Sequence, residues 1–229
     1  MLQNISGSRL MDKKQALVII GSSTGAIDVL GMLFTDLKAE NVSVIIVQHI
    51  IQNFIHRVAM RINRISDMEI TVARDGEQIE PGHVYFAPDD FHLILQDNEI
   101  LRYYDGDKHN RFKPSIDILM NSVVPSTTKQ IIGIILTGMA TDGVQGMVHI
   151  KKMGGFTIAQ DPLTATIDSM PKCAIDTGCI DLVATPKEIR KILVTFDSTG
   201  TLPPMRAVPE PQLELPPISV PKSHTNKKF

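Results

Sequence analysis

Short apolar runs alternate along this chain with segments in which apolar residues recur every three or four positions. The runs are rich in valine and isoleucine, which is typical of strands buried on both faces. They span residues 18–20, 42–47, 131–137 and 156–160. The segments 24–38 and 53–65, and one that Pro114 opens, carry the apolar stripe of a helix packed on a sheet. Since strands and helices alternate, we predict an α/β fold that is doubly wound around a mostly parallel sheet.

Two regions depart from this alternation. From Glu69 to Tyr104 the chain changes to short alternating runs, and Asp97-Asn98 between two of them is typical of a hairpin turn, so we predict an antiparallel hairpin excursion. Toward the end the sequence becomes rich in proline, with seven prolines after residue 197. We therefore expect a disordered lead at 1–14, one domain at 15–197 and a disordered, proline-rich tail at 198–229.

The composition excludes several classes of function. A formal net charge of -2 at pH 7 and a pI near 6.4 give no electrostatic basis for binding nucleic acid or an anionic membrane. The two cysteines, Cys173 and Cys179, have no histidine pair at metal-ligand spacing, and we expect neither a metal nor an organic cofactor. The start of the chain does not resemble a secretion signal, and no apolar run approaches the roughly 20 residues that a membrane helix needs. We therefore expect a cytoplasmic protein without membrane insertion.

The first apolar run stops at a Gly-x-Ser-x-Gly sequence formed by Gly21, Ser23 and Gly25. A serine on a tight turn between a strand and a helix presents its hydroxyl above the sheet, and the glycines let backbone and substrate come close. The same residues also fit a plain turn in which the serines and Thr24 cap a helix. A dinucleotide-binding loop fits less well, because it needs a second glycine in place of Ser23 and an acidic residue near Gln48.

Three predicted strands end in residues of chemical interest. Ser23 follows the first run, His49 the second, and Asp142 the run at 131–137. The carboxyl ends of parallel strands lie at one edge of a sheet, where ligands bind. A nucleophilic serine needs a base within hydrogen-bond reach, and that base needs a carboxylate to orient it. We therefore predict a triad of these three residues, with His92 as the second candidate for the base.

Six motifs follow one another in a distinctive order. They are Ile-Gly-Ser-Ser-Thr-Gly-Ala at 20–26, Val-Gln-His at 47–49, Tyr-Phe-Ala-Pro at 85–88, Lys-Pro-Ser-Ile-Asp at 113–117, Leu-Thr-Gly-Met-Ala-Thr-Asp-Gly at 136–143 and Ile-Ala-Gln-Asp at 158–161. Together they resemble the catalytic domain of the chemotaxis protein-glutamate methylesterases (CheB), over nearly all of residues 16–196. The sequence departs from that family at Ile50 and Ile51, where prolines are usual, which changes the groove beside the histidine.

The resemblance implies a site and a reaction. The family's nucleophile falls on Ser23, its base on His49 and its orienting aspartate on Asp142. The oxyanion and substrate-lining residues that it implies are Thr24, Met139 and Lys113. Met139 would contact the oxyanion through its backbone amide. The implied reaction is hydrolysis of glutamyl γ-methyl esters on the cytoplasmic helices of methyl-accepting chemoreceptors, with deamidation of receptor glutamines as a second activity. The competing interpretation is a non-enzymatic module that holds an anion or a partner at the glycine turn.

The resemblance also bears on regulation. Family members typically carry an N-terminal receiver domain whose phosphorylation relieves a block on the catalytic face. Because so few residues precede the first strand, we expect constitutive activity, and a separate receiver protein becomes a candidate partner. We expect removal of 198–229 to leave turnover on a small ester within about twofold. Finally, Arg57, Arg61 and Arg64 are predicted to share a helix face that could meet acidic receptor helices.

Overall fold

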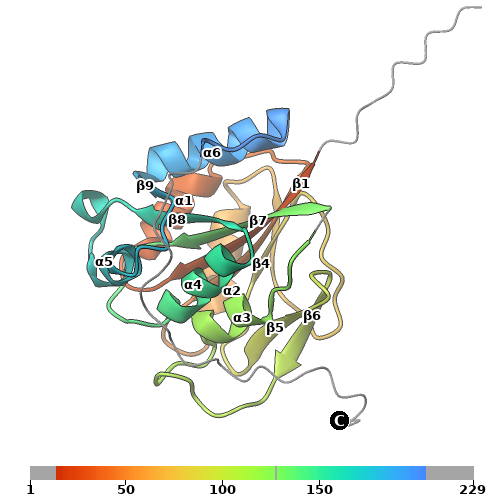
Figure 1. Cartoon of the computed structure of the whole chain (residues 1–229). Coiled ribbons are helices and arrows are strands. Elements are labelled where there is room, and N and C mark those ends of the chain that lie inside the picture. Colours follow the sequence, from red (N-terminus) through yellow and green to blue (C-terminus); the bar gives the residue numbers. More distant parts are fainter. Residues whose placement is uncertain (1–13, 127, 205–229) are drawn as a thin grey trace, which may run out of the picture.

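The computed structural model describes residues 14–126 and 128–204, and within them seven parallel strands form the central sheet (Figure 1). Their order across the sheet is β3-β4-β2-β1-β7-β8-β9. Their bounds are β1 (Gln15–Ser22), β2 (Val42–Gln48), β3 (Glu69–Val72), β4 (His83–Phe86), β7 (Lys129–Ile135), β8 (Phe156–Gln160) and β9 (Leu182–Ala184). This arrangement confirms the doubly wound, mostly parallel α/β fold.

The central strand β1 shows why its sequence is apolar at nearly every position. Leu17 and Ile19 belong to the core on one face of the sheet, while Val18 and Ile20 belong to the core on the other. All four side chains are fully buried, because successive residues of a strand alternate between faces and both faces are covered. β1 pairs with β2 on one side and β7 on the other, so its carboxyl end lies between theirs.

Helices cover both faces of the sheet and give the molecule three layers (Figure 1). One face is covered by α1 (Ala26–Phe34), α2 (Ile55–Asn63) and α6 (Pro186–Thr199). The other is covered by α3 (Ile116–Ser122), α4 (Val144–Lys152), α5 (Ser169–Asp176) and the antiparallel hairpin of β5 (His92–Gln96) and β6 (Ile100–Tyr104). A short 3₁₀ helix, Pro162–Thr164, follows β8. No helix in the described part of the chain is long and apolar enough to cross a membrane.

The layer arrangement creates a crevice at the carboxyl edge of the sheet. Helix α1, which follows β1, packs on one face, whereas α4, which follows β7, packs on the other. Because β1 and β7 are neighbours, the loops that leave them diverge. Ligands of doubly wound sheets bind at such a switch point.

The predicted antiparallel excursion was too long. Among the strands of the described chain only β5 and β6 pair antiparallel, joined by a turn in which Asp97 and Asn98 have φ of 53° and 60°, and Gln78 adds an isolated antiparallel bridge to Ile100. The strands β3 and β4 instead pair in parallel with each other, and β4 pairs in parallel with β2. These two strands have four residues each; β3 is the edge strand of the sheet and is partly exposed, whereas β4 lies between β3 and β2. A run of only four residues carries too little pattern to show whether a strand pairs in parallel or antiparallel.

Two helix starts also differ from the prediction. Helix α1 begins at Ala26 rather than Thr24, because Gly25 caps it in the left-handed conformation, with φ of 83°. Helix α3 is not opened by Pro114: Ser115 is its N-cap, and the hydroxyl of Ser115 accepts a hydrogen bond from the amide of Ile118 at 3.3 Å. At the other end of the domain, α6 continues past the expected boundary to residue 199, while most of the expected lead and tail lies outside the described residues.

Candidate active site

Ser23 is the first residue after β1 and lies on the turn into α1. Its backbone N–H donates to the carbonyl oxygen of Thr137 at 3.1 Å, and its own carbonyl accepts from the N–H of Ala26 at 3.1 Å. These bonds tie the turn both to the loop after β7 and to the start of the helix. The residue is 7% exposed, so its hydroxyl is reached only through the crevice.

Gly138 brings the loop after β7 against the serine. A Cβ atom at Gly138 would lie 2.6 Å from the Cβ of Ser23, so a larger residue would displace the turn. The following residue, Met139, and the residue after the serine, Thr24, both offer backbone amides at this junction. Among the described residues, neither of these two amides donates an internal hydrogen bond. Both are therefore available to a negatively charged oxygen.

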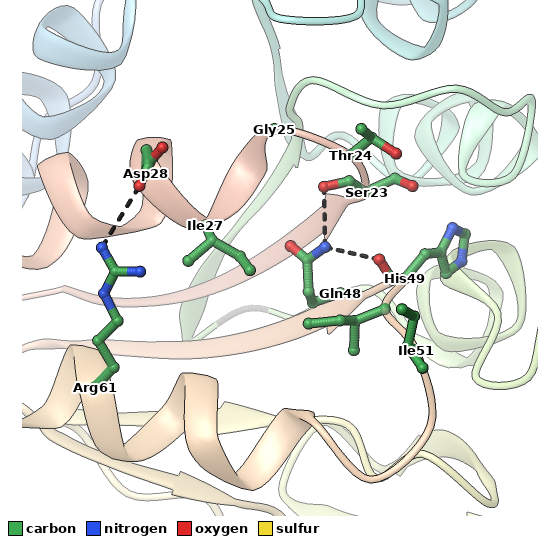
Figure 2. A pocket seen from close by; sticks show the side chains of 10 residues that line it. Ser23, Thr24, Gly25, Ile27, Asp28, Gln48, His49, Ile51 and Arg61 are labelled. Carbon is green, nitrogen blue, oxygen red and sulfur yellow. Dashed lines mark hydrogen bonds and ion pairs between the residues drawn. The ribbon is translucent and has the colours of Figure 1, made fainter.

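His49 follows β2 and lies beside the serine turn (Figure 2). Its backbone N–H donates to the carbonyl oxygen of Ser22 at 2.9 Å, which extends the pairing of β1 and β2 by one residue. The imidazole is almost fully buried, with 6% of the side chain exposed, and its Nε2 lies 2.9 Å from Oδ2 of Asp142. Neither ring nitrogen makes a well-directed hydrogen bond within the described chain. Nδ1, which does not face the carboxylate, is thus the nitrogen left for a reaction partner.

Asp142 lies in the loop between β7 and α4, and its carboxylate is completely buried. Its Oδ1 accepts hydrogen bonds from the hydroxyl of Ser115 at 2.8 Å and the amide of Asp117 at 3.1 Å. Its Oδ2 accepts from the amide of Ile116 at 2.8 Å and faces His49. Burial alone would raise the pKa of Asp142, but His49 and the amides at the start of α3 outweigh it and hold the pKa below its ordinary value. Asp142 is therefore ionised at neutral pH.

A second carboxyl group, that of Asp117, is buried close to Asp142. Its Oδ1 accepts a hydrogen bond from the amide of Gly146 at 2.8 Å, and Nε2 of His109 lies 3.8 Å from its Oδ2. Burial, followed by the negative charge of Asp142, raises the pKa of Asp117 to about 8. The two carboxyl groups thus share one negative charge at neutral pH, and it resides on Asp142.

His109, Asp117 and Asp142 also form a cluster of potential metal ligands, with ligand atoms within 4.8 Å of one another. Both oxygens of Asp142 already accept hydrogen bonds, and Oδ1 of Asp117 accepts one from the amide of Gly146. Hydrogen bonds to these carboxyl oxygens account for the cluster, and we assign no metal to it.

Two adjoining cavities, of about 440 and 640 Å³, open on this edge of the sheet. The residues that line both are Thr24, Gln48, His49, Ile50 and Ile51. Ser23 lines the smaller cavity, and Lys113 lines the larger one. The two cavities therefore form one groove that passes the histidine, with apolar side chains in the positions after it.

A sequence model of the CheB methylesterase family matches residues 18–193. This chain belongs to the CheB methylesterase family. The matched residues include Ser23, His49 and Asp142, so the groove and the buried His49–Asp142 pair lie within the shared domain.

Individual relatives agree with this assignment. Proteins named protein-glutamate methylesterase/protein-glutamine glutaminase from Thiobacillus denitrificans and Hydrogenovibrio crunogenus are 35% and 38% identical to this chain over 194 and 170 residues. The alignments cover 83% and 73% of this chain but 54% and 45% of the relatives, so the chain spans about half of their length. The crystal structure of the Thermotoga maritima CheB methylesterase catalytic domain matches with a TM-score of 0.74 and 34% identity, over 80% of this chain and 98% of that chain.

In this CheB domain one important residue could not be singled out from the sequence. The side-chain amide of Gln48 donates to the backbone carbonyl oxygens of Ser23 and His49, at 2.9 and 2.8 Å (Figure 2). Its Oε1 accepts from the hydroxyl of Ser22 at 2.8 Å. The only signal in the sequence was the position of Gln48 between an apolar strand and His49. Its role becomes visible only in the structure, where the turn that carries Ser23 lies against it.

The other expected site residues differ in their placement. Thr24 lines both cavities, whereas the side chain of Met139 lines neither and is 65% exposed. Lys113 lines the larger cavity, but its ammonium group pairs with Asp105 at 2.5 Å and lies 5.8 Å from the ring centroid of Phe91. Lys113 is therefore held in the wall of the groove by contacts of its own.

The geometry disfavours the second candidate for the base, His92. Its side chain is fully buried, its Nε2 bonds to the carbonyl oxygen of Asp107 at 2.9 Å, and its Nδ1 accepts from the amide of Ser115 at 3.1 Å. Burial lowers the pKa of His92, so the ring is neutral and both nitrogens are engaged. His92 holds the backbone between β6 and α3 in place and has no nitrogen left to activate a serine.

Proposed function

We propose that this chain is a serine carboxyl-ester hydrolase that demethylates glutamyl γ-methyl esters on the cytoplasmic helices of methyl-accepting chemoreceptors. Ser23 is the nucleophile, His49 the general base and Asp142 the residue that orients His49. The observation that carries the proposal is the buried imidazole of His49, which faces the ionised Asp142 at 2.9 Å and lines the same cavity as Ser23, with its other nitrogen without a partner in the described chain. A buried nitrogen without a partner costs free energy, which is expected where a reaction partner completes the site.

The proposed reaction proceeds in two halves. Nδ1 of His49 takes the hydroxyl proton as Oγ of Ser23 attacks the ester carbonyl, and the negative charge of Asp142 stabilises the resulting imidazolium. The amides of Thr24 and Met139 donate to the oxyanion of the tetrahedral intermediate. His49 then gives the proton to departing methanol. Water, activated by the same base, hydrolyses the acyl-enzyme and releases the glutamate side chain.

Deamidation would follow the same path with ammonia in place of methanol. The relatives named above combine both activities in their names, methylesterase and glutaminase. The two reactions differ in the leaving group, but both proceed by attack on a side-chain carbonyl carbon and through the same oxyanion. One triad therefore serves both reactions. We therefore propose glutamine deamidation as a second activity of the same site.

The interpretation as a non-enzymatic module accounts for fewer of the contacts. A glycine turn that only holds an anion needs Thr24 and its neighbours, but it gives no reason to bury an ionised carboxylate behind a histidine. The proposed partners are accordingly receptor helices as substrate and a separate receiver protein as regulator, and the proposed location is the cytoplasm.

Labelling with a fluorophosphonate distinguishes the two interpretations. An activated serine forms a stable phosphonyl ester, whereas a serine that only caps a helix does not react. We expect mass spectrometry to place the label on Ser23, and His49→Ala to abolish it. Ser169→Ala is a suitable control, because Ser169 is a partly buried serine near Gly138 whose hydroxyl bonds only to a backbone carbonyl. Absence of label on the folded wild-type chain would contradict the proposed function.

A further inference from the structure

The ring of His49 lies flat against the ring of Phe112. The two ring centroids are 3.8 Å apart and the planes differ by 3°, so the contact covers one face of the imidazole. Phe112 does not belong to a helix or strand but to the loop between β6 and α3. It therefore reaches the histidine from a part of the chain that supplies none of the three proposed triad residues.

The loop holds Phe112 in place without help from His49. His109 and Phe112 exchange backbone hydrogen bonds of 3.1 and 2.8 Å, which closes a tight turn in which Asn110 and Arg111 have positive φ. The base of the loop is tied by the buried His92, which bonds to the backbone of Asp107 and Ser115. Phe112 is thus presented by a backbone that is already fixed on both sides of it.

His49 needs such a support, because its polar contacts do not fix the plane of its ring. The Nε2 atom lies at ion-pair distance from Asp142 but without a well-directed hydrogen bond, and Nδ1 has no partner in the described chain. Rotation of the ring about its bond to Cβ would drive one edge into Phe112. A parallel aromatic face also attracts the imidazolium that forms when the base takes up its proton.

We propose that Phe112 is a positioning residue for His49, because its ring holds the imidazole in the plane in which one nitrogen faces Asp142 and the other faces Ser23. The proposal rests on the proposed function and adds to it a fourth residue, outside the triad. Phe112 also lines the larger cavity, but the face of its ring lies against the base, so its loss should lower the rate of the chemical steps more than the binding of a small ester.

The variants Phe112→Leu and Phe112→Tyr separate an aromatic support from simple apolar bulk. For Phe112→Leu we expect kcat on a small methyl ester to fall by about 10- to 100-fold, the range in which misplacement of a catalytic group acts, with KM within about twofold. Phe112→Tyr keeps the flat ring and should retain kcat within about threefold. Phe196→Leu is the matched control, because Phe196 is a buried ring of α6 that lines neither cavity, and it should keep the wild-type kcat.

A second measurement does not depend on activity. In protein labelled with ¹³C in its histidine rings, NMR relaxation should show that the His49 imidazole is less ordered in Phe112→Leu than in wild type, with His92 unchanged as an internal reference. If wild type and Phe112→Leu share the same kcat and the same ring order, the positioning role is wrong even though the esterase proposal stands. If Phe112→Leu raises KM and leaves kcat and the ring order unchanged, Phe112 acts only as a wall of the groove and the proposal is likewise overturned. An inactive wild type would instead contradict the proposed function, and the ring order would still decide the role of Phe112.

Discussion

The side-chain amide of Gln48 donates a hydrogen bond to the backbone carbonyl of Ser23, at 2.9 Å. A second bond from the same amide reaches the carbonyl of His49, at 2.8 Å. One buried side chain thus sets the spacing between the turn that carries the proposed nucleophile and the turn that carries the proposed base. The last paired residues of β1 and β2 are Ser22 and Gln48, and one more backbone bond joins His49 to Ser22, so this amide continues the connection where the sheet itself ends.

The variant Gln48→Leu should lose both stability and turnover. It leaves the carbonyl of His49 without its partner, at a cost of about 1–3 kcal/mol for an unsatisfied buried group, and removes one of the two hydrogen bonds that the carbonyl of Ser23 accepts. We expect urea denaturation to show a loss of unfolding free energy of that order, and kcat to fall by at least about tenfold because both turns shift.

The control for that variant is Gln160→Leu. Gln160 is also fully buried at a strand end, but it bonds to the backbone of Thr137 and Thr164 rather than to either proposed catalytic residue. It should lose similar stability and much less turnover. Equal loss of turnover in the two variants would show that Gln48 acts through general stability alone.

Asp117 should make stability fall as the pH rises. In an unfolded chain an aspartate ionises near pH 4, whereas the pKa of Asp117 in the folded chain is raised to about 8. Between these values the folded chain holds a proton that the unfolded chain has released. The free energy of unfolding therefore decreases with pH in this range, by up to roughly 1 kcal/mol per pH unit, and the whole loss is present above pH 8. The pKa of Asp142 is lowered, so its contribution to the free energy of unfolding has the opposite sign. That contribution is lost only as the pH falls below the ordinary pKa of an aspartate.

The variant Asp117→Asn removes this titration while keeping a neutral group of the same shape. We expect its unfolding free energy to be flatter than that of wild type between about pH 5 and pH 8, and to exceed it at pH 8. Asp176→Asn, at an exposed position on α5, should follow the wild-type profile. Parallel profiles for wild type and Asp117→Asn would contradict the protonated state of Asp117.

The arginines of α2 should affect docking of a receptor and not the chemistry. Arg61 lines the smaller cavity and lies 3.6 Å from Asp28, while Arg57 lies over the ring of Phe54 at 5.2 Å. Arg64 is the C-cap residue of the same helix, whose Arg61 brings positive charge to the groove. Replacing all three by serine should raise KM for receptor membranes several-fold and flatten its dependence on salt, with a small ester unaffected.

The comparison for the arginine variant is a double change of Lys187 and Lys191 to serine on α6, which removes exposed positive charge elsewhere on the molecule. It should leave KM for receptor membranes unchanged. If the arginine variant lost activity equally on both substrates, the arginines would be structural.

The sequence predicted the fold wherever both faces of a strand are buried, because a continuous apolar run as short as that of β1 fits a doubly buried strand better than an amphipathic helix. It misjudged the direction of β3 and β4, because a run of four residues is too short to distinguish parallel from antiparallel pairing. It also began α1 too early, since the left-handed cap at Gly25 follows from the contacts of the turn and not from the apolar stripe.

For the site, strand ends were enough to group Ser23, His49 and Asp142, because parallel strands deliver their carboxyl ends to one edge. The supporting residues Gln48, Asp117 and Phe112 could not be found in this way. Each acts through a partner that is distant in the chain or through a backbone carbonyl, and neither kind of contact leaves a pattern in the sequence.

Methanol release from methylated receptor membranes tests the central claim most directly. Wild-type chain should release methanol, while Ser23→Ala and His49→Ala should be folded and slower by about a millionfold, and Asp142→Asn should lose somewhat less, as in other triads whose members act as a unit. Circular dichroism on each variant shows whether the fold is kept. Folded His49→Ala with wild-type methanol release, or folded wild-type chain that releases none, would contradict the proposed triad and its reaction.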